Sequence, residues 1–341
     1  MNNVPTDINR KIAGWLLTCC ALVFVMVVLG GVTRLTGSGL SMVDWRPVSG
    51  ALPPLSDEAW QRTFEMYQQT PEFEKKNSHM NVDDFKGIFW LEYLHRLLGR
   101  IIGIVFLLPF VYFLAKGWIR RDEWLKYGAM FVLGGFQGLL GWYMVKSGLV
   151  DNPNVSQYRL TAHLISAFLI YAYMLWVALS LRFPAGDGQR HPWYGRSLAM
   201  TAIITVTVLS GGFVAGLKAG KIYNTFPMMG RYWVPPDFMA LDPWWRNLFD
   251  NMATVQFDHR VLAVTTFLLI IVFWWRMPRD GLSTRARKGV NALLHAGTLQ
   301  VALGIATLLL VVPIPLAAAH QGVAMLLFTV ALFLTHSLRR A

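Results

Sequence analysis

Eight histidines occur in the chain, and four of them recur at corresponding places in two halves of the sequence. Residues 94–98 (LHRLL) align with 258–262 (DHRVL), and residues 161–164 (TAHL) align with 318–321 (AAHQ). The recurring histidines are His95, His163, His259 and His320, whereas His79, His191, His295 and His336 have no counterpart. Imidazole is a common metal ligand, so the recurrence indicates a ligand set that is present twice.

Each half therefore offers two imidazoles, one in each of two apolar segments and at similar depth. Two such rings can approach a porphyrin iron from opposite faces, a geometry that helix bundles supply readily. A tetrahedral zinc site would need three or four protein ligands, so haem fits better. A single buried histidine is more often only hydrogen-bonded, but four in register favour ligation. That structural role is expected for His295 and His336, and His79 and His191 are expected in water.

Two further positions accompany the repeated histidines. Arg96 and Arg260 follow His95 and His259 directly, and a guanidinium can pair bidentately with a haem propionate. The alternative is that each arginine snorkels to the lipid headgroups. Glu92 precedes His95 by three residues, and the matching position in the second half is Gln256. An acid in an apolar segment is a candidate for proton or cation handling, unless Glu92 only caps its helix.

The elements that must position these residues are long apolar helices. The chain is 55% hydrophobic and 15% charged, well below the roughly 25% charged residues of soluble domains. A membrane-spanning helix needs about 20 predominantly apolar residues. The sequence predicts an all-α membrane protein with eight spans, near residues 12–32, 88–114, 127–147, 159–181, 196–217, 253–275, 289–312 and 316–338.

The distribution of charge predicts the orientation of these spans. The side with both termini carries 16 of the 31 basic residues but only 5 acidic residues, a net charge of +11 against +1 on the other side. By the positive-inside rule both termini are cytoplasmic, and the formal net charge of +12 then reflects membrane orientation rather than nucleic-acid binding. The first apolar segment is long enough to remain as a span, and no cleavable signal peptide is expected. The only cysteines, Cys19 and Cys20, lie in that segment, and no disulfide is expected.

The repeat also predicts the domain organisation. Gly30 and Gly31 correspond to Gly211 and Gly212, and residues 136–141 correspond to 299–304. Four spans in each half imply two pseudo-symmetric four-helix bundles in parallel orientation, because an even number of spans returns the chain to the same side. The turn-rich segment 182–196 separates domains 1–185 and 186–341. The long first external loop, 36–86, is expected to contain helix and to cover its bundle.

Glycines gather in one predicted span, and their expected role is structural. Gly134, Gly135, Gly138 and Gly141 all fall within residues 127–147. Small residues allow close packing of membrane helices, and no chemistry is assigned to them.

Several of these segments together resemble the haem A synthase family over nearly the whole chain. They are residues 92–96 (EYLHR), 161–163 (TAH), 257–260 (FDHR), 319–321 (AHQ) and 30–41 (GGVTRLTGSGLS). The chain lacks the cysteine pair that some members carry in the first external loop, so it is similar to the proteobacterial and mitochondrial branch.

The resemblance implies an oxidoreductase that converts the position-8 methyl group of haem o to a formyl group. Oxygen would come from water, through a hydroxylated intermediate. The first half, with His95 and His163, would hold haem o, and the second half, with His259 and His320, would hold a resident haem b. Glu92 matches the proposed catalytic acid. The resemblance also implies a location in a bacterial inner membrane, with membrane lipid around the chain. The implied partners are the cytochrome oxidase assembly machinery, with haem o synthase or a second copy of the chain as further candidates. No nucleic acid partner is expected.

Two other functions could use the same histidines. A di-haem b membrane cytochrome would pass electrons to or from quinol, although the contrast between Glu92 and Gln256 speaks against simple electron relay. A haem carrier or oxidase assembly factor would need only the ligands. Only an enzyme alters the porphyrin, so analysis of the extracted haem distinguishes the three.

Overall fold

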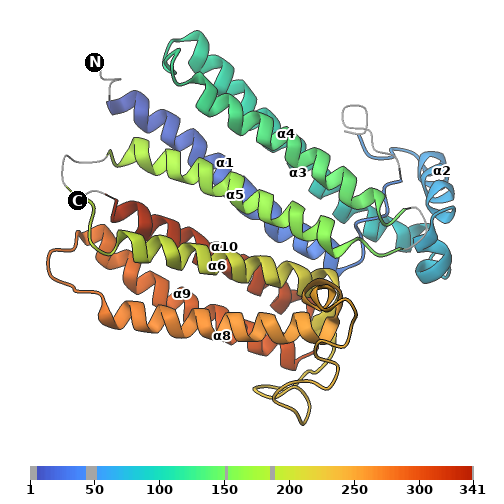
Figure 1. Ribbon diagram of the computed structural model, residues 1–341. Helices are drawn as coiled ribbons and strands as arrows, with labels where there is room; N and C mark the ends of the chain where they lie inside the picture. Colours follow the sequence, from blue (N-terminus) through green and yellow to red (C-terminus); the bar gives the residue numbers. More distant parts are fainter. Residues whose placement is uncertain (1–5, 44–51, 150–152, 185–188, 340–341) are drawn as a thin grey trace. The chain divides into compact units, whose positions relative to one another are not determined.

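The computed structural model consists of helices and connecting loops (Figure 1). It describes residues 6–43, 52–149, 153–184 and 189–339, and among these no β-strand occurs. Eight helices are long and apolar enough to cross a membrane, which confirms the predicted all-α, multi-pass membrane protein. These spans are α1 (Thr6–Leu35), α3 (Val82–Ala115), α4 (Trp124–Lys146), α5 (Gln157–Arg182), α6 (Tyr194–Gly216), α8 (Met252–Arg276), α9 (Thr284–Leu309) and α10 (Ile314–Ser337).

The chain divides into two compact units, one made of Met1–Ala21 with Leu164–Ala341 and the other of Leu22–His163. In the first unit, α6 packs against α8 and α10, and α9 packs against the same two helices. These four helices run side by side in Figure 1, coloured from yellow to red. The same unit also contains α5 from Leu164 onward and the start of α1, so the predicted division into two four-helix bundles stays a prediction. The predicted boundary between residues 185 and 186 lies outside the described residues.

The first external loop contains two helical segments. They are α2 (Asp57–Gln68) and a π-helical turn, η2 (Phe73–Asn77), which confirms the expected helix in this loop; residues 44–51 of the loop lie outside the described residues. Ser56 caps α2, since its hydroxyl accepts a hydrogen bond from the Ala59 N–H. The segment is thus anchored locally at its start.

Aromatic side chains join α2 to the first turns of α3. Trp60, Phe64 and Tyr67 of α2 form one buried cluster with Phe85, Phe89 and Tyr93 of α3. Phe85 lies at its centre, stacked on Tyr67 at 5.0 Å between ring centroids. Burial of such rings is the main source of stability in a small cluster. The cluster therefore fixes α2 on the helix that carries Glu92 and His95.

The external loop of the second half is built differently. Between α6 and α8 lie two 3₁₀ turns, η3 (Ala219–Lys221) and η4 (Trp244–Arg246), and the short helix α7 (Asn247–Asp250). Asn251 caps α8 by accepting hydrogen bonds from the N–H groups of Ala253 and Thr254, and its amide donates to the Asp237 carbonyl. One side chain thus joins the loop to the start of the helix that carries His259.

Candidate haem site

The four repeated histidines each lie against a glycine of the preceding span. A Cβ atom added to Gly30 of α1 would lie 2.9 Å from Cε1 of His95 on α3, and one added to Gly141 of α4 would lie 3.1 Å from Cε1 of His163 on α5. Contacts below 3.4 Å are tighter than a real Cβ normally makes, so any side chain at these glycines would push against the ring. Glycine is therefore part of the histidine environment in this unit.

The second half repeats the contact at the corresponding residues. A Cβ on Gly211 of α6 would lie 3.2 Å from Cε1 of His259 on α8, and one on Gly304 of α9 would lie 2.9 Å from Cε1 of His320 on α10. Gly30 and Gly211 are equivalent in the sequence repeat, and so are Gly141 and Gly304. The local packing of all four histidines therefore follows the repeat.

The general packing role expected for the glycines of α4 is wrong for three of them. A Cβ added to Gly134, Gly135 or Gly138 would meet nothing within 4 Å, and only Gly141 has a close neighbour. Gly134, Gly138 and Gly141 share one face of α4, so the difference is the level along the helix: only Gly141 lies beside the His163 ring.

The two histidines of each unit are close enough to interact electrostatically, His95 with His163 and His259 with His320. Each of the four side chains is partly exposed. Among the described residues, no three His, Cys, Asp or Glu side chains gather into a metal site, and His320 Nδ1 is buried without a hydrogen-bond partner. Two imidazoles in each unit, with no third ligand described beside them, fit a haem better than a tetrahedral metal site.

The other histidines have different surroundings. His79 is exposed in the external loop, as expected. His295 is exposed on α9, so the buried structural role expected for it is wrong. His336 is buried beside Trp176, with 5.1 Å between ring centroids, and its Nε2 lies 3.3 Å from Ser180 Oγ. The structural role predicted for His336 agrees with these contacts.

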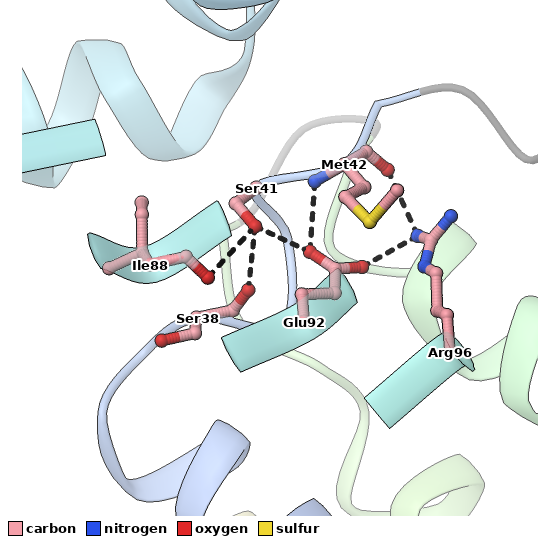
Figure 2. Close-up of polar contacts among 6 residues, drawn as sticks. All are labelled: Ser38, Ser41, Met42, Ile88, Glu92 and Arg96. Atoms are coloured by element: carbon pink, nitrogen blue, oxygen red, sulfur yellow. Dashed lines mark hydrogen bonds and ion pairs between the residues drawn. The ribbon is translucent and has the colours of Figure 1, made fainter. Parts of the chain in front are cut away.

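Glu92 lies at the centre of a hydrogen-bonded network that joins α3 to the segment after α1 (Figure 2). Only 3% of the residue is exposed. Its Oε2 accepts hydrogen bonds from Ser41 Oγ at 2.7 Å and from the Met42 N–H at 2.8 Å. Its Oε1 pairs with Arg96 Nη2 at 2.6 Å, and the same Nη2 donates to the Met42 carbonyl at 3.0 Å. The buried carboxylate is thus compensated by one cation and two further donors.

Glu92 does not cap its helix. The α3 helix begins at Val82, where Asn81 and Asp84 form a capping box. Glu92 lies well inside the helix, so the dipole of the helix terminus does not account for it. The helix-capping interpretation of Glu92 is therefore wrong.

Gln256 occupies the equivalent place in the second half with the opposite hydrogen-bond polarity. It is 2% exposed, and its Nε2 donates to the carbonyls of Ala219 and Ile222 at 2.9 and 2.5 Å. Its Oε1 accepts from Arg260 Nη2 at 3.2 Å. Where Glu92 accepts hydrogen bonds from loop donors, Gln256 donates to loop acceptors. The second half therefore has no buried carboxylate at this position.

Both predicted propionate arginines also contact their external loops. Arg96 donates to the Met42 carbonyl, and Arg260 Nη1 donates to the Thr225 carbonyl at 2.8 Å. Arg260 Nε is buried and has no hydrogen-bond partner among the described residues. Each arginine holds loop backbone beside its histidine, and Arg260 keeps one donor for a further acceptor.

Sequence comparison identifies the family. Residues 13–332 match the profile of the family described as cytochrome oxidase assembly protein. The chain belongs to this family.

Relatives in this family are similar over nearly the whole chain. A haem A synthase of Nitrosospira multiformis is 55% identical over 338 residues, which cover 98% of this chain and 95% of the relative. The haem A synthase COX15 of Arabidopsis thaliana is 46% identical, covering 96% and 74%, and that of Homo sapiens is 45% identical, covering 99% and 85%. The similarity spans both units and all eight spans.

The sequence analysis did not identify the residues that contact the four imidazoles and the Glu92 carboxylate. Gln137 and Gln300 contact His163 and His320, and Ser210 contacts His259. The repeat already aligned Gln137 with Gln300, so recurrence of a polar residue in an apolar span was the available signal. Ser41 had no such signal, because its approach to Glu92 depends on how the loop folds.

Proposed function

We propose that the chain is a haem A synthase, an oxidoreductase that converts the position-8 methyl group of haem o to a formyl group with water as the oxygen source. The observation that carries this function is the buried Glu92 carboxylate in the same unit as His95 and His163, with an amide, Gln256, in its place beside His259. The names of the relatives support the same reaction. A pure electron carrier has no need of an acid in one half alone.

In this proposal the first half binds the substrate haem o, and the second half binds a resident haem b. His95 with His163 and His259 with His320 would hold the two irons, and Arg96 and Arg260 would pair with the propionates. A bound porphyrin would supply the electronic chemistry, and the four electrons that leave the methyl group as water adds would pass to an electron acceptor outside the protein. Glu92 takes up the proton released from the reacting carbon or water, and Arg96 and Ser41 hold its carboxylate in one orientation.

The setting of the enzyme follows from the same reasoning. The protein lies in a bacterial inner membrane with both termini in the cytoplasm, so the external loops and the outer histidines face the opposite side. Haem o synthase would deliver the substrate, and the cytochrome oxidase assembly machinery would receive the product. Membrane lipid surrounds the spans, and a homo-oligomer is compatible with these roles.

The decisive experiment is extraction and chromatography of the haems from purified protein, expressed with and without a source of haem o. Haem a or its hydroxylated precursor should appear only when haem o is supplied. Haem b alone under both conditions would instead identify a di-haem cytochrome, and unaltered haem o would identify a carrier.

The role of Glu92 has its own test, the Glu92→Gln variant. This variant keeps the side-chain shape but removes the base, so we expect haem-loaded protein with product formation reduced by at least about 100-fold, the lower range of general acid–base catalysis. Glu74→Gln changes an exposed acid in the external loop and should retain activity. Full activity of Glu92→Gln would remove Glu92 from the mechanism.

A further inference from the structure

The hydrogen bonds of His259 determine which of its ring nitrogens carries the proton. Ser210 Oγ lies 2.8 Å from His259 Nδ1 and also 2.8 Å from the Thr207 carbonyl oxygen. A hydroxyl has one hydrogen, and two oxygens at that distance repel unless the hydrogen lies between them. Ser210 therefore donates to Thr207 and accepts from His259, so Nδ1 is protonated and Nε2 keeps its lone pair.

His163, in the first half, has the opposite arrangement. Gln137 Nε2 lies 2.8 Å from the His163 carbonyl oxygen and 3.2 Å from His163 Nδ1. An amide nitrogen only donates, and its two hydrogens serve these two acceptors. His163 Nδ1 therefore accepts a hydrogen bond, and the proton of the neutral ring is on Nε2.

The glutamine of the second half contacts the other ring nitrogen. Gln300 Nε2 faces His320 Nε2 at 3.4 Å. The amide donor there faces a nitrogen that bears a lone pair, so His320 has the same tautomer as His259. Two residues that are equivalent in the repeat, Gln137 and Gln300, thus favour different tautomers of their histidines.

A metal ligand must offer a lone pair, and a hydrogen bond from the other ring nitrogen strengthens it. His259 meets both conditions at Nε2 before any metal arrives. His163 meets neither, because ligation through Nε2 requires moving its proton to Nδ1 and giving up the Gln137 hydrogen bond. We propose that Ser210 and Gln137 are positioning residues that make His259 a permanent haem ligand and His163 an exchangeable one.

This inference rests on the proposed function, because only an enzyme that exchanges substrate for product in one half needs unequal ligands. A substrate site must release its haem in every turnover, whereas a resident haem must stay. The tautomers of His163 and His259 account for that difference without any change in the ligand type.

The test uses the full-length protein loaded with haem b and measures haem transfer to an excess of an apo-globin, together with the midpoint potential of each haem. Ser210→Ala should speed loss of haem from the second half by about 10-fold or more, as for other residues that support metal ligands. It should also raise the midpoint potential of that haem, because a less basic ligand stabilises the ferric iron less. Ser210→Thr keeps the hydroxyl and should restore both values.

Gln137→Leu removes the amide donor and should slow haem loss from the first half by a similar factor, because the hydrogen bond that keeps the His163 proton on Nε2 is lost. Unchanged transfer rates and potentials in Ser210→Ala, or faster haem loss from the first half in Gln137→Leu, would overturn the inference. Product analysis of the same preparations separates the two ideas. Haem transfer that behaves as expected without product formation would refute the synthase and leave the ligand assignment intact.

Discussion

Four glycines determine how closely the preceding helices approach the histidine rings. Gly30, Gly141, Gly211 and Gly304 each leave the space that a Cβ would take from a ring. Glycine destabilises a helix interior by about 0.5–1 kcal/mol relative to alanine. The four glycines beside the histidine rings therefore lower the stability of their helices. That loss of stability is offset if the ring position matters for ligation.

Alanine substitutions at these glycines should therefore reduce haem binding while leaving the fold intact. In α6, Gly211→Ala places a Cβ 3.2 Å from His259, whereas Gly195→Ala meets nothing within 4 Å. We expect Gly211→Ala to weaken haem binding in the second half by about 10-fold, a typical effect of disturbing a ligand's surroundings. Absorbance titration of the purified variants measures this. Equal affinity in Gly211→Ala and Gly195→Ala would show that the contact is incidental.

Gly141 and Gly138 provide the same comparison in α4. The first faces His163 at 3.1 Å and the second faces open space. Gly141→Ala should weaken haem binding in the first half only, and Gly138→Ala should have no effect on either half. An effect of Gly141→Ala on the second half would contradict the assignment of each glycine to its own histidine.

The histidines could be found from the sequence because a ligand type recurring in two halves is visible without a structure. The glycine contacts could not, because one glycine of α4 faces a ring while three others in the same helix do not. The contacts of Glu92 could likewise be predicted only in part. Its contrast with Gln256 is in the sequence, but its three hydrogen-bonding partners include Ser41 and Met42, which reach it only through loop folding.

At the scale of elements, the first external loop is tied to α3 in two ways. The aromatic cluster of α2 packs on Phe85, Phe89 and Tyr93, and the Ser41–Met42 segment bonds to Glu92. Within the loop, burial raises the pKa of the Tyr67 hydroxyl, so it stays protonated and donates to Glu72 Oε2 at 3.3 Å. The loop is therefore packed on α3 rather than a simple connection; that it covers the bundle stays a prediction.

Removing the central ring of this cluster should release α2. Phe85 is fully buried between the aromatic rings of α2, and a Phe→Ala change in such a site costs about 3–5 kcal/mol. We expect Phe85→Ala to increase hydrogen exchange and protease cleavage within Asp57–Gln68 while the spans stay protected. Met66→Ala alters an exposed side chain of the same helix and is the control. Unchanged protection of α2 in Phe85→Ala would mean that other contacts hold this helix.

At the scale of the whole molecule, the placement of charge and the lengths of the loops support one orientation. The connections between α3 and α4 and between α8 and α9 are short. Basic residues lie within the first (Lys116, Arg120 and Arg121) and on the helix ends beside the second (Arg276, Arg285, Arg287 and Lys288). The Glu92 network and the loop from α6 to α8 lie at the other ends of the spans. The structure confirms eight spans, and an even number places both termini on one side. Membrane-spanning helices can be predicted from composition, because a run of about 20 apolar residues has few alternative structures. The pseudo-symmetry of the two halves depends on how the spans pack together, which no single span determines, so it stays a prediction.

The orientation can be tested by single cysteines and a membrane-impermeant maleimide. Trp233, in the loop between α6 and α8, is 70% exposed, and Asp280, between α8 and α9, is also exposed. The natural cysteines are buried in α1, which keeps background labelling low. Because the net charge is +11 on the side of the termini, Trp233→Cys should react in intact spheroplasts and Asp280→Cys only after lysis. The reverse pattern would place Glu92 and the four histidines near the cytoplasmic face, and haem o would then have to reach its site from that side.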